Sequence, residues 1–138
     1  MINRITPDNI QELKDNEVFV FGANLSSIHG GGAAKLAYEK FGAIWGGRMG
    51  IQGKSYAIPT KSEGITRTLS IEEIQPYVQQ FIQWAKYHTG NVFLVTAIGT
   101  GLAGIESDIM AELFRDVINI PNIHLPKQFW NYLLKDVV

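Results

Sequence analysis

Two glycine-bearing stretches hold the residues whose types and spacing could bind a phosphate. In the first, residues 18–42, the chain reads VFVFGANLSSIHGGGAAKLAYEKFG and passes from an apolar run through three consecutive glycines into helix-forming residues. Amides at the start of a helix lack an intrahelical acceptor, and the helix dipole adds partial positive charge there. Because glycine has no Cβ, an anion can approach the backbone closely. This first glycine loop (residues 22–32) favours an anion site; a glycine-rich turn without a ligand is the alternative.

A second glycine loop follows another apolar run. Residues 91–98, NVFLVTAI, are typical of a buried strand, and residues 99–104, GTGLAG, come before residues that favour a helix. In a parallel sheet, ligands bind outside the carboxyl ends of the strands. We therefore expect both loops to face one crevice, where a diphosphate would be held between them.

The elements that must position these loops alternate along the chain. We expect strands at 18–21, 55–59, 91–98 and 122–125, helices at 6–14, at 33–40, from Ser70 to before Gly90, at 107–117 and at 127–138, and a long loop at 43–54. The third helix has the strongest signals, since Ser70-Ile71-Glu72-Glu73 matches a capping box and its apolar residues share one face. Uninterrupted apolar strands between helices predict a single α/β domain over residues 1–138, a three-layer α-β-α fold with a mainly parallel sheet.

Composition excludes several classes of protein. Cysteine is absent from the 138 residues, which excludes disulfide frameworks and thiolate metal sites, and three scattered histidines predict no metal site. A net charge of −1 gives no support for broad nucleic-acid binding. No segment reaches membrane-spanning length and no signal-peptide pattern opens the chain, so we expect no membrane contact and a cytoplasmic location. The first loop has no G-x-G-x-x-G, which argues against a dinucleotide oxidoreductase.

The two loops together resemble those of macrodomains, the ADP-ribose-binding α/β family. Phe21-Gly22-Ala23-Asn24 and the run Gly30-Gly31-Gly32 stand where that family has an Asn-Ala-Ala-Asn-like turn and a glycine run. Residues 98–105, IGTGLAGI, are similar to its second loop, approximately Ile-Ser-Thr-Gly-Ile-Phe-Gly-Tyr. The resemblance covers most of residues 18–117 and implies an ADP-ribose-type ligand with no further cofactor.

The middle of the chain is similar to the terminal ADP-ribose glycohydrolase branch of that family. Lys61 matches the lysine that this branch has after its middle strand. Ala103 stands where the branch has its aspartate, and Ala33-Ala34 stand where another hydrolytic branch places one. Neither catalytic carboxylate is therefore present at its expected position.

The resemblance implies a set of site residues. Asn24 and Lys61 are the candidate catalytic residues, with Asn24 holding the distal ribose or a water molecule; for Asn24 a local turn is the alternative, and for Lys61 a surface lysine that attracts phosphate. Thr100 contacts phosphate or stiffens its loop, and His29 contacts phosphate, acts as an acid–base group or is inert. The expected ligand-binding residues are Gly22, Ala23, Asn24, His29, Gly30, Gly31, Gly32, Ala33, Gly99, Thr100, Gly101, Leu102 and Ala103.

We expect the chain to bind ADP-ribose or a related nucleotide between the two loops. One alternative is an ADP-ribosyl glycohydrolase in which Asn24 positions water and Lys61 or His29 assists. A second alternative is an interaction protein with a vestigial crevice that binds no nucleotide.

Overall fold

Strand β1 (Glu17–Asn24) is the middle strand of a five-stranded sheet in the order β2-β3-β1-β4-β5. The computed structural model describes residues 3–25, 32–44, 49–62, 67–101 and 103–135. The other elements are α1 (Gly32–Lys40), β2 (Gly50–Gln52), β3 (Ser55–Lys61), α2 (Ile71–Lys86), β4 (Val92–Val95), α3 (Ser107–Leu113), the 3-10 helix η2 (Arg115–Asn119), β5 (Ile123–His124) and α4 (Lys127–Leu133).

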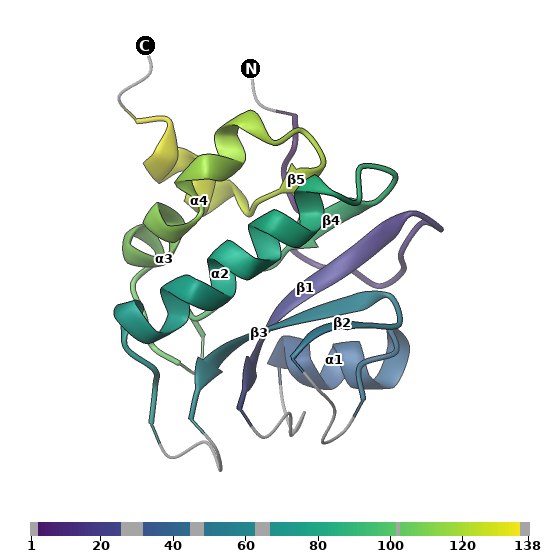
Figure 1. Ribbon diagram of the computed structural model, residues 1–138, viewed down its shortest axis with the longest axis horizontal. Helices are drawn as coiled ribbons and strands as arrows, with labels where there is room; N and C mark the ends of the chain where they lie inside the picture. Colours follow the sequence, from purple (N-terminus) through teal and green to yellow (C-terminus); the bar gives the residue numbers. More distant parts are fainter. Residues whose placement is uncertain (1–2, 26–31, 45–48, 63–66, 102, 136–138) are drawn as a thin grey trace.

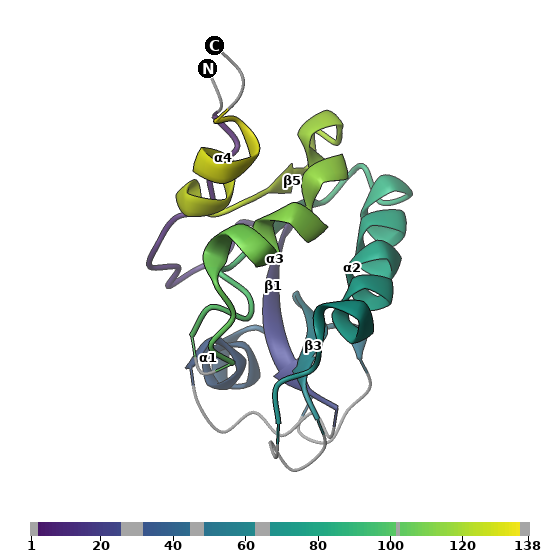
Figure 2. The same cartoon turned by 90° about the vertical axis from the view of Figure 1, so that its left-hand side faces the viewer.

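The sheet is mainly parallel. Strands β3 and β4 pair in parallel with β1 on either side, β5 pairs in parallel with β4, and only β2 is antiparallel to its neighbour. In Figure 2, α1 lies on one side of β1 and β3 and α2 on the other. The predicted α/β fold with helices on both faces of a mainly parallel sheet is therefore confirmed.

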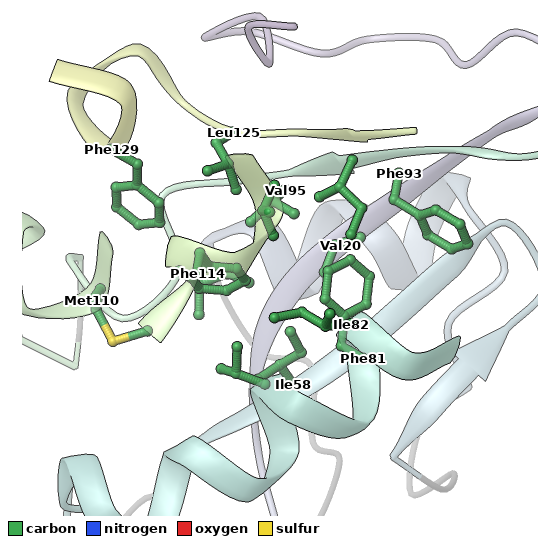
Figure 3. Close-up of a cluster of buried hydrophobic side chains, with 14 of the residues drawn as sticks. Val20, Ile58, Phe81, Ile82, Phe93, Val95, Met110, Phe114, Leu125 and Phe129 are labelled. Atoms are coloured by element: carbon green, nitrogen blue, oxygen red, sulfur yellow. The ribbon is translucent and has the colours of Figure 1, made fainter. Parts of the chain in front are cut away.

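Successive side chains of a strand point to opposite faces of the sheet, so the core consists of one cluster on each face. Val18 and Val20 of β1 belong to a large cluster with α2, α3 and α4, whereas Phe19 and Phe21 belong to a smaller cluster with α1. Figure 3 shows part of the larger cluster, in which Phe81, Phe93 and Phe114 are fully buried. Both faces of the parallel strands are thus covered, which explains why their sequences are continuously apolar.

Helix α2 begins where its local signals predict. Ser70 accepts a hydrogen bond from the Glu73 amide, and the Glu73 carboxylate accepts one from the Ser70 amide, so the capping box is present. The predicted apolar face lies on the sheet (Figure 1), with Ile74, Val78, Phe81, Ile82 and Ala85 all buried. No helix among the described residues is long and apolar enough to cross a bilayer.

The predicted helix at residues 6–14 is wrong. That segment is irregular, because the Thr6 amide donates to the Leu125 carbonyl at 2.9 Å and Ile5 forms a parallel bridge with Leu125. Ile10 is buried under β1 in the smaller cluster. Tertiary contacts along the sheet edge therefore override the local signal of Thr6 and Pro7.

Several other boundaries differ from the prediction. The strand predicted at 18–21 continues through Asn24, and the helix predicted at 127–138 ends at Leu133. The loop predicted at 43–54 contains the short strand β2, whose Ile51 pairs with Tyr56 of β3. The helix predicted at 107–117 changes to a 3-10 helix after Phe114, a fully buried residue. The strand predicted at 91–98 ends at Val95, and the amide and the hydroxyl of the next residue, Thr96, both donate to the Val20 carbonyl of β1.

Candidate functional site

The carboxyl ends of three parallel strands meet at one edge of the sheet. Strand β1 carries Gly22, Ala23 and Asn24 to this edge, β3 carries Lys61, and the second glycine loop follows β4. A Cβ placed on Gly22 would lie 3.5 Å from Cγ2 of Ile98, so the start of the second loop lies against the end of β1. Of the predicted residues, His29, Gly30, Gly31 and Leu102 lie outside the described part of the chain.

The two candidate catalytic residues are neighbours. Asn24 and Lys61 are register partners, and the Leu25 amide donates to the Lys61 carbonyl at 3.0 Å. The register shifts just before this pair, since Ala23 faces Pro59 and leaves Thr60 as the extra residue of a bulge. Bulges occur often beside functional sites, where they re-aim a side chain.

Asn24 is less accessible than a ligand-binding residue would be. Its exposed fraction is only 5%, whereas Lys61 is half-buried. A ribose or an attacking water would reach the Asn24 amide only after neighbouring residues move. The two residues are therefore adjacent, and the lysine is the more open of them.

The second glycine loop is a tight backbone turn. Gly99 has a φ of +77°, and the Ile105 amide donates to its carbonyl at 2.8 Å, while the Gly104 amide donates to the Gly101 carbonyl at 3.0 Å. The Thr100 hydroxyl donates to the Ala97 carbonyl at 2.8 Å. This bond fits the second role predicted for Thr100, in which its hydroxyl stiffens the loop.

Gly99 and Gly101 differ in whether the fold requires a glycine at that position. A Cβ on Gly99 would lie 3.1 Å from Sδ of Met110, and its φ is positive, so packing and backbone both require glycine. A Cβ on Gly101 would meet no atom within 4 Å, no positive φ requires glycine there, and the residue is exposed. The fold does not need a glycine at Gly101. A molecule that approaches the backbone closely would need one.

Helix α1 provides an electropositive end beside the sheet. It begins at Gly32, which is exposed with a φ of +58°, and its first turn has no acidic residue. Its first amides lack intrahelical acceptors, and the helix dipole there is not neutralised by a carboxylate in the same turn. The amides of Gly32 and Ala33, at the start of α1, are placed to donate to an anion.

A pocket of about 280 Å³ opens next to this helix end. Its lining residues come from the N-terminal segment, the centre of β1, the start of α1, the exit of β4 and the start of α4: Thr6, Pro7, Asp8, Asn9, Ile10, Phe19, Gly32, Ala33, Leu36, Thr96, Ala97, Pro126 and Gln128. Ligand pockets typically measure about 300–1,000 Å³, so this volume suits one moiety of a nucleotide and not a whole dinucleotide-sized molecule.

The sequence prediction missed most of this lining. Of the predicted site residues, the pocket includes Gly32 and Ala33 and none from the second loop. The sequence predicts a helix start at Thr6-Pro7-Asp8 and places Thr96 inside the strand at 91–98, so it gives no signal for a ligand at either position.

No cluster of three or more histidine, aspartate or glutamate side chains that could hold a metal ion forms among residues 3–25, 32–44, 49–62, 67–101 and 103–135. The charged group that the pocket offers to a ligand is the carboxylate of Asp8, which is exposed.

Comparison with known proteins supports the fold alone. No protein-family description and no curated protein matches the sequence. One solved structure, a protein of unknown function from Bacteroides thetaiotaomicron, is similar over 84% of this chain and 88% of its own, with a TM-score of 0.60 and 13% identity. At that identity the likeness shows a shared α/β architecture.

Proposed function

We propose that this chain binds ADP-ribose or a related nucleotide derivative at the carboxyl edge of its sheet. The observation that carries the proposal is that β1, which precedes the first glycine loop in sequence, and β4, which precedes the second, are neighbouring parallel strands, with a pocket beside the start of α1. The loops were expected to bind phosphate because of their backbone amides, and their shared edge lets one diphosphate contact both.

We expect the pocket to bind the nucleoside part of the ligand and the start of α1 to bind its phosphates. Phe19, Ile10 and Leu36 line it with apolar surface on which a base or ribose can pack, and Asp8 supplies a carboxylate. A carboxylate accepts hydrogen bonds from an amino group or from ribose hydroxyls. A nucleoside in this pocket would carry its phosphates at the start of α1, where the helix dipole stabilises negative charge.

The glycohydrolase alternative is favoured by the register pairing of Asn24 and Lys61. It is opposed by Ala103 and Ala33, which stand where related hydrolases would have a carboxylate, and by the burial of Asn24. We therefore prefer binding without turnover. Incubation with ADP-ribosylated protein separates the two functions, because a binder releases ADP-ribose at no more than the background rate.

Gly101 offers the sharpest test of binding. Gly101→Glu places a negative side chain where the fold has room, so the free energy of unfolding should hardly change while calorimetry shows a large loss of ADP-ribose affinity. Gly90→Glu is the matched control, because a Cβ on this exposed glycine also meets no atom within 4 Å and the residue lies before β4, at the opposite strand end.

Three results would count against the proposal. A wild-type protein that binds no ADP-ribose supports the vestigial interaction protein, and equal affinities of wild type and Gly101→Glu place the ligand elsewhere. Equal losses in both glutamate variants would show that added charge, and not position, lowers affinity. The cytoplasmic location and the lack of broad nucleic-acid binding remain predictions.

A further inference from the structure

The chain segment that follows β3 is tied to the second glycine loop by one side chain. The Thr68 hydroxyl donates to the Ala103 carbonyl at 2.7 Å, joining residues 35 positions apart in the sequence. Thr68 lies outside this loop, so its bond supports the loop from another part of the chain. Ala103 is itself one of the predicted ligand-binding residues.

Thr68 also faces the candidate catalytic lysine. Lys61 and Thr68 form an antiparallel bridge, and on either side of it the Ser62 amide donates to the Arg67 carbonyl at 2.9 Å and the Leu69 amide to the Thr60 carbonyl at 2.8 Å. The backbone of Thr68 therefore supports the end of β3, while its hydroxyl supports the loop after β4.

The segment that carries Thr68 is firmly anchored. The Arg67 guanidinium donates to both carboxylate oxygens of Glu73, at 2.8 and 2.9 Å, which attaches the segment to the first turn of α2. This contact and the Ser70 amide lower the pKa of Glu73 to about 2, so its carboxylate stays charged above mildly acidic pH. Leu69, the next residue, is buried in the larger core cluster. Thr68 is thus held between the end of β3, the first turn of α2 and the core residue Leu69.

We propose that Thr68 is a positioning residue that holds the second glycine loop in the shape its ligand requires. Without the Thr68 hydroxyl, the Ala103 carbonyl loses its partner and the turn around Gly101 opens more readily. A ligand that needs the amides of this loop aligned must then restore the turn on binding, which weakens its affinity. The effect on ligand binding rests on the proposed function, whereas the effect on the loop does not.

The test combines Thr68→Val with Thr68→Ser and Thr89→Val. Valine removes the hydroxyl and keeps the shape, serine keeps the hydroxyl, and Thr89 is an exposed threonine in the turn before β4. Hydrogen exchange at the Gly104 and Ile105 amides reports on the loop, since both donate within it. Calorimetry with ADP-ribose as the probe reports on the ligand.

We expect both amides to exchange faster in Thr68→Val, and the Kd for ADP-ribose to rise about threefold to tenfold, the effect of one lost hydrogen bond. Thr68→Ser and Thr89→Val should behave as the wild type does. Unchanged exchange in Thr68→Val overturns the proposal, and faster exchange with unchanged affinity overturns its link to the ligand. If the wild type binds no ADP-ribose, the proposed function fails, and the exchange rates alone decide whether Thr68 holds the loop.

Discussion

Gly53 lies directly against Gly42, so that a Cβ on Gly53 would come within 2.9 Å of the Gly42 Cα. The contact joins the turn between β2 and β3 to the chain just after α1. It is reinforced by the Lys54 amide, which donates to the Phe41 carbonyl at 2.9 Å. Helix α1, whose N-terminus lines the pocket, is therefore held at its other end by two glycines.

This contact predicts that Gly53→Ala is strongly destabilising. Alanine would carry a left-handed backbone, with φ at +58°, and would clash with a backbone that cannot move aside. We expect a loss of about 2–4 kcal/mol in the free energy of unfolding, measured by chemical denaturation. Gly90→Ala, with space for its methyl group, should be neutral or slightly stabilising. Equal stabilities of the two variants would contradict the contact.

Replacing Arg4 should also lower the free energy of unfolding substantially. Its guanidinium donates to four backbone carbonyls around η2 and β5, those of Val117, Ile118, Ile120 and Ile123. Arg4→Met would leave several of these oxygens without a partner, at a cost of about 2–4 kcal/mol in the free energy of unfolding. Arg115→Met is the control, because solvent screens its exposed pair with Glu112 and the substitution should change the free energy of unfolding far less. A cost no larger for Arg4 than for Arg115 would show that water replaces these bonds.

His124 predicts a pH dependence of stability. Burial first, and then the charge of Arg4, lower the pKa of His124 below its ordinary value of 6.5, against an opposing effect of Glu17. The unfolded chain therefore takes up a proton before the folded protein does, and stability falls as the pH decreases from about 7.5 through 6.5 towards the folded pKa. The melting temperature of the wild type should drop over this range, and less so in His124→Gln. Parallel pH profiles of the two proteins would contradict the assignment.

Replacing Asp8 tests whether the pocket contributes to the affinity for ADP-ribose. Asp8→Asn keeps the size of the side chain and removes its charge, so ADP-ribose should bind about tenfold more weakly if a nucleoside hydrogen bonds there. Because Asp8 is exposed, the melting temperature of the free protein should stay the same. Asp15→Asn, an exposed change in the turn before β1, is the control for calorimetry. Unaltered affinity in Asp8→Asn would place the nucleoside outside this pocket.

Elements with strong local signals could be predicted from the sequence. The capping box at Ser70 determines where α2 begins, and the apolar residues of α2 recur at helical spacing because they face a sheet. The run from Val18 to Phe21 predicts a buried strand for the same kind of reason, since both faces of β1 are covered. The order of these elements was sufficient to predict a mainly parallel sheet with helices on both faces.

The candidate site needed the tertiary structure. Thr6 and Pro7 carry a helix signal, yet the pairing of Ile5 with Leu125 draws this segment along the sheet, and the pocket forms beneath it. The bond between Thr68 and Ala103, and the open space around Gly101, also depend on residues far apart in the sequence. Local signals act over a few residues, so the sequence by itself determined most of the elements and their order, but it missed β2 and predicted a helix at 6–14 that does not form. The pocket and the supports of its loops are decided by contacts that exist only after the sheet has formed.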